Sequence, residues 1–292
     1  MQNLRIIPRL DIKGPNLVKG IHFEGLRVMG KPEAFARFYY EQGADELLYI
    51  DAVASLYGRN SLLDIVKRTS EEIFIPFCVG GGLRSVDDIR QVLRAGADKV
   101  SLNTSAIADP KLISEASRAF GSSTIVISIE AVRQPNGRYE CLTDYGRETS
   151  GVDAYDWARR AEDLGAGEVM ITSIDREGTG EGFDLDITGQ IASSLSIPVI
   201  AGGGAGSARH VQEVVEKGKA DAVAIAGMFH YDTISRITKA DESLFATEGN
   251  VEFLQGRRGP ISAGRLTPCG IPELKDHLHS AGIACRNLSL VR

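Results

Sequence analysis

Short apolar runs recur along the chain, and a polar or glycine-containing segment follows each of them. The segments between them, such as Ser85–Ala95 and Ala154–Leu164, carry apolar residues at the i, i+3, i+4, i+7 spacing of a helix with one buried face. Apolar strands that alternate with amphipathic helices indicate a parallel sheet covered by helices. The eight apolar runs are Arg5–Leu10, Leu47–Ile50, Phe77–Val79, Lys99–Leu102, Ile125–Ile129, Val169–Ile174, Val199–Ala201 and Ala222–Ala226.

This pattern predicts an α/β protein, and two architectures fit it. One is an open, doubly wound sheet, and the other is a closed (β/α)8 TIM barrel. Eight strand–helix units in roughly 230 residues favour the barrel. We therefore expect a single barrel domain over residues 1–292, with an irregular insertion at about 232–270 before a last helix.

The chain also repeats itself. Residues 75–82 (IPFCVGGG) resemble residues 197–204 (IPVIAGGG), and residues 43–47 (GADEL) resemble residues 165–169 (GAGEV). Both matches lie 122 positions apart. Two separate matches at one offset predict two four-stranded half-barrels related by a pseudo-twofold axis.

Composition and charge exclude several classes of protein. The chain has 33 Lys and Arg against 39 Asp and Glu, a net charge of −6, which argues against nucleic acid or an anionic membrane as the main partner. No apolar run approaches the ~18 residues of a membrane span, and the first residues do not resemble a secretory signal. Four widely spaced cysteines fit neither a disulfide framework nor a zinc site, so a cytoplasmic protein without a bound metal is expected.

The ends of the predicted strands carry candidate anion-binding groups. Glycine triplets at 80–82 and 202–204 follow strands three and seven, where bare backbone can bring N–H groups close to an oxyanion. The alternative for each triplet is a plain tight turn. Because each triplet is followed by a second suitable strand end, we expect one phosphate site in each half. The predicted positions are Gly81, Gly82, Ser101, Asn103 and Thr104 in the first half, and Gly203, Gly204, Ala226 and Gly227 in the second.

Two carboxylates end the equivalent strands one and five. Asp11 and Glu130 would lie between the two phosphate sites, over the middle of a long ligand. Two carboxylates can act as general acid and general base if their surroundings separate their pKa values. The alternative is that one of them is only structural.

Four charged residues stand where strands begin, at the opposite end of the barrel. They are Arg5, Glu46, Lys99 and Glu168. A charge inside a barrel is costly unless it is paired, and these two cations and two anions could close into a ring. The ring would be either an ordinary set of salt bridges or a polar gate opposite the active site.

Six motifs together resemble the cyclase subunit of imidazole glycerol phosphate synthase. The similarity covers residues 4–231 and resumes at 271–286. It implies a TIM barrel with no metal or organic cofactor, and a lyase-type enzyme of histidine biosynthesis. The substrates would be ammonia from a glutaminase partner and a bis-phosphorylated ribulosyl-formimino aminoimidazole carboxamide ribonucleotide. The products would be imidazole glycerol phosphate and aminoimidazole carboxamide ribonucleotide. The motifs are Arg5–Lys13, Val18–Gly20, Gly43–Leu47, Val79–Gly82, Ala95–Ser101 and Thr172–Thr179.

The resemblance also implies residue roles. Asp11 and Glu130 would be the catalytic pair, and the four charges at the strand starts would form the gate through which ammonia enters. The glutaminase would dock on the N-terminal face of the barrel, where Asp98 would contact it. Further substrate contacts are implied for Lys19, Asp51, Thr172, Glu177 and Gly178.

Some positions depart from the family pattern and keep other functions open. Glu130 and Glu177 stand where Asp is usual, Gly202 and Gly227 where Ser is usual, Val53 where Thr is common, and Arg9 where Cys is common. A carboxylate moved by about 1 Å can change the rate by roughly a hundredfold. The alternatives are a paralogue that delivers ammonia to another phosphorylated sugar or nucleotide, as in surface-sugar amidation, and a non-catalytic barrel that only binds a glutaminase. The related half-barrel isomerase needs no ammonia, and the four charges argue against it.

Overall fold

A closed parallel barrel forms the centre of the molecule in this computed structural model, which describes residues 3–54, 62–240 and 265–286. Each barrel strand pairs with the next in parallel register, and the last pairs with β1, so the sheet has no open edge. The prediction of a TIM barrel is therefore confirmed, and the open sheet is excluded. The barrel strands are β1 (Arg5–Lys13), β4 (Leu47–Asp51), β5 (Phe77–Gly80), β6 (Lys99–Leu102), β7 (Ile125–Arg133), β10 (Glu168–Ser173), β11 (Val199–Gly202) and β12 (Ala222–Ile225).

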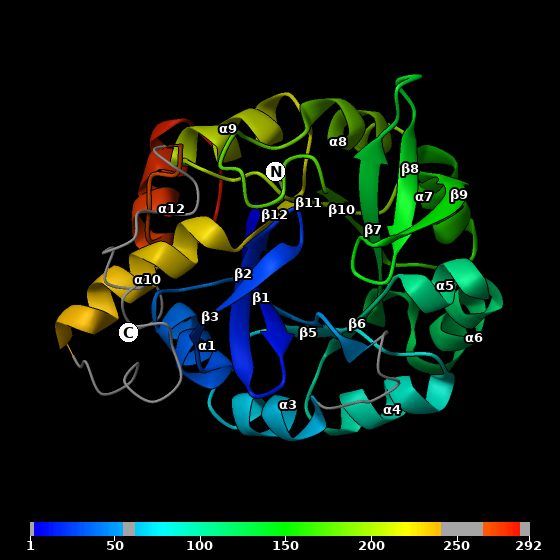
Figure 1. The fold of residues 1–292 in the computed structure, drawn as a ribbon, viewed down its shortest axis with the longest axis horizontal. Coiled ribbons are helices and arrows are strands. Elements are labelled where there is room, and N and C mark those ends of the chain that lie inside the picture. The colour runs from blue at the N-terminus through cyan, green and yellow to red at the C-terminus, as the bar shows by residue number, and fades with distance from the viewer. Residues whose placement is uncertain (1–2, 55–61, 241–264, 287–292) are drawn as a thin grey trace.

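Helices surround the barrel on the outside (Figure 1). Their apolar faces pack on the outward side chains of the strands, such as Ile6, Leu10 and Ile127, and this layer is the main hydrophobic core. The helices are α1 (Pro32–Glu41), α3 (Leu63–Ser70), α4 (Val86–Arg94), α5 (Thr104–Ala108), α6 (Lys111–Phe120), α7 (Ala154–Asp163), α8 (Leu185–Ala192), α9 (Ala208–Glu216), α10 (Gly227–Ala240) and α12 (Ile271–Ser280), with a 3-10 turn at Ser122–Thr124. Among the described residues, no helix has both the length and the apolar character to cross a membrane.

The two halves of the barrel repeat each other, as the sequence predicts. Helices α1 and α7, α3 and α8, and α4 and α9 begin and end 122 positions apart, and so do β5 and β11. The repeat extends to single hydrogen bonds. Ser85 caps α4 by accepting from the backbone N–H of Asp88, and Ser207 caps α9 in the same way through His210.

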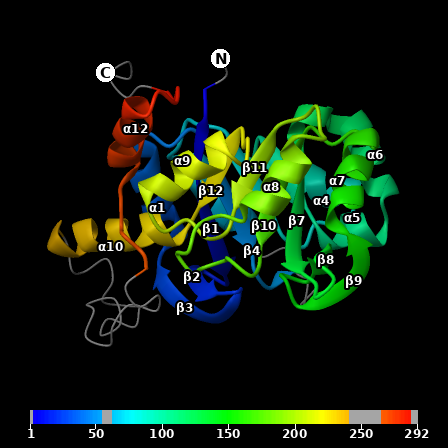
Figure 2. The same cartoon turned by 90° about the horizontal axis from the view of Figure 1, so that it is seen from above.

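Two β-hairpins that the apolar pattern did not predict stand on the barrel. One is β2 (Asn16–Ile21) with β3 (Glu24–Gly30), and the other is β8 (Tyr139–Thr143) with β9 (Glu148–Asp153). Figure 2 shows both at one end of the molecule, opposite α12 and the start of β1. Their turn residues, His22–Phe23 and Asp144–Tyr145, all have positive φ and again lie 122 positions apart.

The predicted insertion at 232–270 is partly helical. Helix α10 continues to Ala240, so an irregular segment can begin only after that residue. Residues 241–264 lie outside the described residues. The chain returns at 265, and α12 begins at Ile271, where the last helix was expected.

Candidate active site

The inward face of β1 joins the two ends of the barrel. Side chains alternate along a strand, so Arg5, Ile7, Arg9 and Asp11 lie on one face. Arg5 lies at the N-terminal end and Asp11 at the end that carries the hairpins, which we call the mouth. Charged groups therefore occupy both ends of the barrel, with apolar residues between them.

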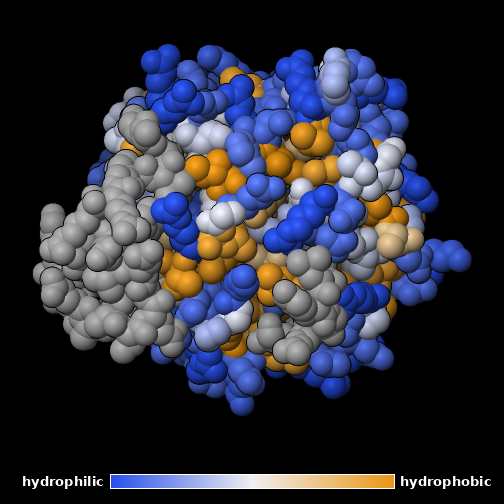
Figure 3. Space-filling view, in the orientation of Figure 1, coloured by the Kyte–Doolittle hydropathy of each residue, from blue (hydrophilic) through white to orange (hydrophobic). Residues whose placement is uncertain are grey.

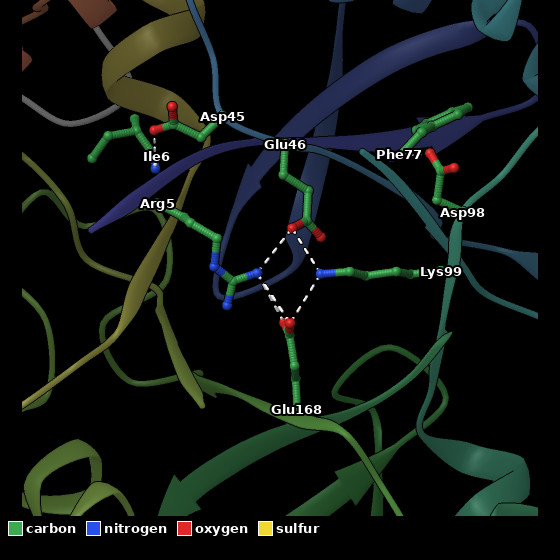
Figure 4. Close-up of polar contacts among 8 residues, drawn as sticks. All are labelled: Arg5, Ile6, Asp45, Glu46, Phe77, Asp98, Lys99 and Glu168. Atoms are coloured by element: carbon green, nitrogen blue, oxygen red, sulfur yellow. Dashed lines mark hydrogen bonds and ion pairs between the residues drawn. The ribbon is translucent and has the colours of Figure 1, made fainter. Parts of the chain in front are cut away.

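The four charges at the strand starts form a closed ring, which we call the charge ring (Figure 4). Arg5 Nη1 lies 2.9 Å from Glu46 Oε2 and 3.1 Å from Glu168 Oε1. Lys99 Nζ lies 2.9 Å from the same two oxygens. Each cation thus contacts both anions, and the predicted juxtaposition of the four residues is present.

Within the charge ring, burial and ion pairing shift the pKa values in opposite directions. Burial raises the pKa of Glu46, and the charge of Lys99 opposes this. Burial alone would lower the pKa of Lys99, but the carboxylates of Glu46 and Glu168 outweigh it and raise the pKa. The four charges are therefore mutually dependent, and removing one leaves the others partly buried and unbalanced.

An apolar layer fills the barrel between the charge ring and the mouth. Its side chains come from strands around the barrel and are buried. They include Ile7, Leu48, Val126, Met170 and Ile200. A small neutral molecule can be accommodated in such a layer far more readily than an ion, because an ion loses its hydration there.

At the mouth, Asp11 is ion-paired with Arg9. Arg9 Nε donates to Asp11 Oδ1 at 2.9 Å, and Nη1 donates to Thr172 Oγ1 at 3.2 Å. All three side chains are buried. The guanidinium also lies over the ring of Phe23, 5.0 Å from its centroid.

Glu130 lies in a different environment. Its Oε2 accepts a hydrogen bond from Asn103 Nδ2 at 3.1 Å, and no ion pair to it is formed within the described residues. Burial raises the pKa of Glu130 to about 7; the nearby negative charge of Asp11 adds to the rise, and the cation of Arg9 opposes it. Near neutral pH, Glu130 can therefore hold a proton.

The predicted phosphate positions of the first half line a single cavity of about 300 Å³ at the mouth, the β5/β6 cavity. Glu130 and Tyr145 also line it. Within the described residues Ser101 Oγ is buried without a hydrogen-bond partner. Other groups are engaged locally: Asp51 Oδ1 accepts from the N–H groups of Val53 and Ala54.

The predicted positions of the second half line the β11/β12 cavity. They are Lys19, Glu177, Gly178, Gly203, Gly204, Ala226 and Gly227. The Lys19 ammonium is ion-paired with Glu177. The free volume is only about 20 Å³, and Leu266 and Tyr231 line the same cavity. Leu266 stands shortly after residues 241–264, which lie outside the described residues. The N–H of the next residue, Thr267, donates to Gly206 O at 2.7 Å and so holds Leu266 at this cavity.

Glycine is required in both cavities for the same reason. Gly81 has φ +97°, and an added Cβ would lie 2.5 Å from the carbonyl oxygen of Asp51. Gly203 has φ +83°, and its Cβ would lie 2.8 Å from the carbonyl oxygen of Ser173. These are equivalent positions in the two half-barrels, so the glycine triplets shape two matching backbone walls.

Comparison with known proteins agrees with this architecture. The model of the family described as histidine biosynthesis protein matches residues 5–235. A protein named imidazole glycerol phosphate synthase subunit HisF from Legionella pneumophila is 62% identical over 206 residues, which cover 70% of this chain and 97% of that relative. This chain belongs to the HisF family. The HisF subunit of Alkaliphilus metalliredigens (strain QYMF) is 49% identical over 240 residues, or 82% of this chain and 95% of that relative.

The N-terminal face of this HisF-family barrel has two notable exposed residues. Asp98 lies next to Lys99 of the charge ring, and its Oδ2 accepts from the backbone N–H of Phe77 at 2.9 Å. One carboxylate oxygen of Asp98 therefore fixes the start of β5. Phe74 is 79% exposed and lines a surface cavity together with Asp98 and Lys99.

Three features of the mouth were not predicted. Arg9 is the first, although its position two residues before Asp11 on a buried strand already places both side chains on one face. The second is the pair of rings Phe23 and Tyr145, whose centroids lie 4.4 Å apart between the hairpins; the 122-residue repeat relates them. The third is Leu266, for which the sequence carries no signal.

The mouth is ringed by polar side chains. In the orientation of Figure 1, which looks onto the hairpin end, hydrophilic residues predominate at the rim and hydrophobic ones gather nearer the middle (Figure 3). Within the described part of the chain, no group of three or more His, Cys, Asp or Glu side chains could hold a metal ion.

Proposed function

We propose that this protein is the ammonia-dependent cyclase subunit of imidazole glycerol phosphate synthase. It combines ammonia with the bis-phosphorylated ribulosyl-formimino aminoimidazole carboxamide ribonucleotide, and releases imidazole glycerol phosphate and aminoimidazole carboxamide ribonucleotide. One observation carries the proposal: two glycine-walled cavities flank a buried pair of carboxylates, above an apolar barrel that ends at a charge ring.

The two carboxylates divide the proton transfers. Asp11, ion-paired with Arg9, is the general base. Glu130, with a pKa of about 7, holds a proton near neutral pH and is the general acid. The two phosphates of the substrate occupy the β5/β6 and β11/β12 cavities, so that its middle lies over these carboxylates. Orientation by both ends supplies part of the rate enhancement.

Ammonia enters at the opposite end, from a glutaminase partner docked on the N-terminal face. The apolar layer suits neutral ammonia and disfavours ammonium. Lys99 is the part of the charge ring best able to move, because its ammonium stands on a flexible four-carbon stem. The exposed Phe74 and Asp98 beside the charge ring support this face as the docking surface.

The test is turnover of the ribulosyl substrate with ammonium salt at high pH and no partner present. Cyclisation is expected, and Asp11→Asn should lower its rate by at least about a hundredfold, the contribution of a general base. Asp163→Asn, at the exposed end of α7, is the matched control and should behave as the unaltered protein.

The outcomes separate the candidate functions. Binding of the substrate without cyclisation would favour a paralogue that transfers ammonia to another phosphorylated compound. Binding of a glutaminase with no affinity for phosphorylated ligands would favour a non-catalytic barrel. An Asp11→Asn variant with nearly full activity would remove Asp11 from the mechanism.

A further inference from the structure

One nitrogen of the Arg9 guanidinium has no hydrogen-bond partner among the described residues. The side chain is 2% exposed, and it lines the β11/β12 cavity together with Lys19 and Gly204. Its Nε donates to Asp11 and its Nη1 to Thr172. Nη2 is buried and has no hydrogen-bond partner among the residues that the structure describes.

A buried donor without a partner is unusual, and more so on a charged group. Arginine carries five N–H donors in a fixed plane, and the contacts to Asp11 and Thr172 use only the Nε and Nη1 sides. The ring of Phe23 covers the guanidinium at 5.0 Å. Asp11, Thr172 and Phe23 thus fix the plane of the Arg9 guanidinium. Its remaining nitrogen, Nη2, is positioned to donate to a ligand.

Side-chain donors are few in the wall of the β11/β12 cavity, and they come from Arg9, Lys19 and Tyr231. Gly203, Gly204 and Gly227 offer only backbone N–H groups. The ammonium of Lys19 is already paired with Glu177. Arg9 adds a second positive charge to this wall, and its buried Nη2 has no hydrogen-bond partner among the described residues. A guanidinium nitrogen suits the terminal oxygens of a phosphate monoester, which accept charge-assisted hydrogen bonds.

We propose that Arg9 is a phosphate-binding and specificity residue. Its Nη2 donates to a terminal oxygen of the substrate phosphate held in the β11/β12 cavity, and its charge selects a phosphorylated end over a neutral one. The inference rests on the proposed function only in treating this cavity as a phosphate site. It requires no turnover, so it can be tested by binding alone.

The experiment is a titration of the full chain with inorganic phosphate, followed by amide NMR. The amides of Gly82 and Thr104 report on the β5/β6 cavity, and those of Gly203 and Gly227 on the β11/β12 cavity. Arg9→Met should weaken phosphate binding about tenfold or more at the second pair of amides, with the first pair unchanged. Arg9→Lys, which keeps a charge beside Asp11, should lose less, and again only at the second pair.

Controls make the result specific. Arg159→Met removes the same charge from the exposed face of α7 and should change neither cavity. Because Leu266 narrows the β11/β12 cavity, the same series in a Leu266→Ala background keeps the comparison measurable if the unaltered cavity admits phosphate weakly. The undisturbed amides of the β5/β6 cavity report that each variant is folded.

Two results would overturn the role of Arg9. One is unchanged affinity at Gly203 and Gly227 in Arg9→Met and Arg9→Lys. The other is an equal loss at both cavities, which would indicate a general electrostatic effect. By contrast, absence of phosphate binding at both cavities, in the unaltered chain and in the Leu266→Ala background, would remove the phosphate sites of the proposed function and this inference with them.

Discussion

At the scale of residues, the mouth places two carboxylates in opposite surroundings. Asp11 has the cation of Arg9 at 2.9 Å, whereas Glu130 accepts a hydrogen bond from the neutral amide of Asn103 and forms no ion pair among the described residues. Both side chains are buried, so their partners distinguish the two surroundings. Two carboxylates in different environments are how a site obtains an acid and a base at one pH.

The first prediction follows from the pKa of Glu130. Its folded-state value of about 7 lies above the ordinary 4.5, so the folded protein holds this proton more tightly than the unfolded chain. This contribution to stability is complete below pH 4.5 and is lost as the pH rises through 7. Between pH 5 and pH 8, the unaltered protein should therefore lose roughly 2 kcal/mol of unfolding free energy relative to Glu130→Gln.

Urea unfolding of both proteins at the two pH values measures this difference. Glu41→Gln, on the exposed side of α1, is the control and should show no such dependence. A gap between Glu130→Gln and the unaltered protein that stays constant from pH 5 to pH 8 would contradict the raised pKa.

At the scale of elements, two equivalent hairpins meet over the mouth. Phe23 comes from the turn between β2 and β3, and Tyr145 from the turn between β8 and β9. Their rings are 4.4 Å apart and tilted by 43°. The turn of the second hairpin is also tied to the β5/β6 cavity, because Asp144 N–H donates to Thr104 Oγ1 at 3.0 Å. The hairpins therefore act as one cover rather than as two separate loops.

The second prediction is that this ring contact couples the hairpins energetically. In a double-mutant cycle with Phe23→Leu and Tyr145→Leu, the unfolding free energies should show a coupling of about 1 kcal/mol, the value usual for aromatic pairs. Phe23→Leu combined with Phe120→Leu, on the distant helix α6, should be additive. A coupling near zero in the first cycle would mean that the hairpins are held independently.

The sequence predicts the barrel strands but neither the hairpins nor the position of Leu266, and the reasons are physical. The barrel strands are buried on both faces, so they read as short apolar runs bounded by glycine, and their ends place Asp11 and Glu130 correctly at the mouth. The strands of the hairpins are partly exposed; β3, for example, alternates irregularly between exposed and buried positions and gives no such run. The position of Leu266 depends on the path of a long connection, which local pattern does not encode.

At the scale of the whole molecule, the two ends of the barrel are built for different partners. The mouth has glycine walls and buried charged side chains, suited to a small anionic ligand. The N-terminal face has the charge ring and an exposed aromatic side chain, suited to another protein. The apolar layer separates the two ends.

The third prediction concerns the docking of the glutaminase. Phe74 is the large apolar side chain most exposed within the described residues, and aromatic residues commonly carry most of the binding energy at an interface. Phe74→Ala should cost about 2 kcal/mol, roughly thirtyfold in Kd, in calorimetric titration against the glutaminase. Arg138→Ala, exposed in the turn between β7 and β8 at the opposite end, should leave the Kd unchanged. Equal Kd values for both variants would place the interface elsewhere.

The last prediction concerns the charge ring, because the proposed path of ammonia from the glutaminase to the mouth passes through it. Lys99→Met with Glu46→Gln removes one cation and one anion, so the ring opens without a change in net charge. Turnover driven by ammonium salt should persist, since the mouth is untouched. Turnover driven by glutamine should become uncoupled, because ammonia is no longer confined on its way into the barrel, and more than one glutamate should form for each imidazole product. The exposed pair Arg37→Met with Glu41→Gln, on α1, is the matched control and should keep the ratio at one. If the Lys99→Met, Glu46→Gln variant also formed one glutamate for each imidazole product, the four charges would be a structural cluster. Ammonia would then reach the carboxylates by another path.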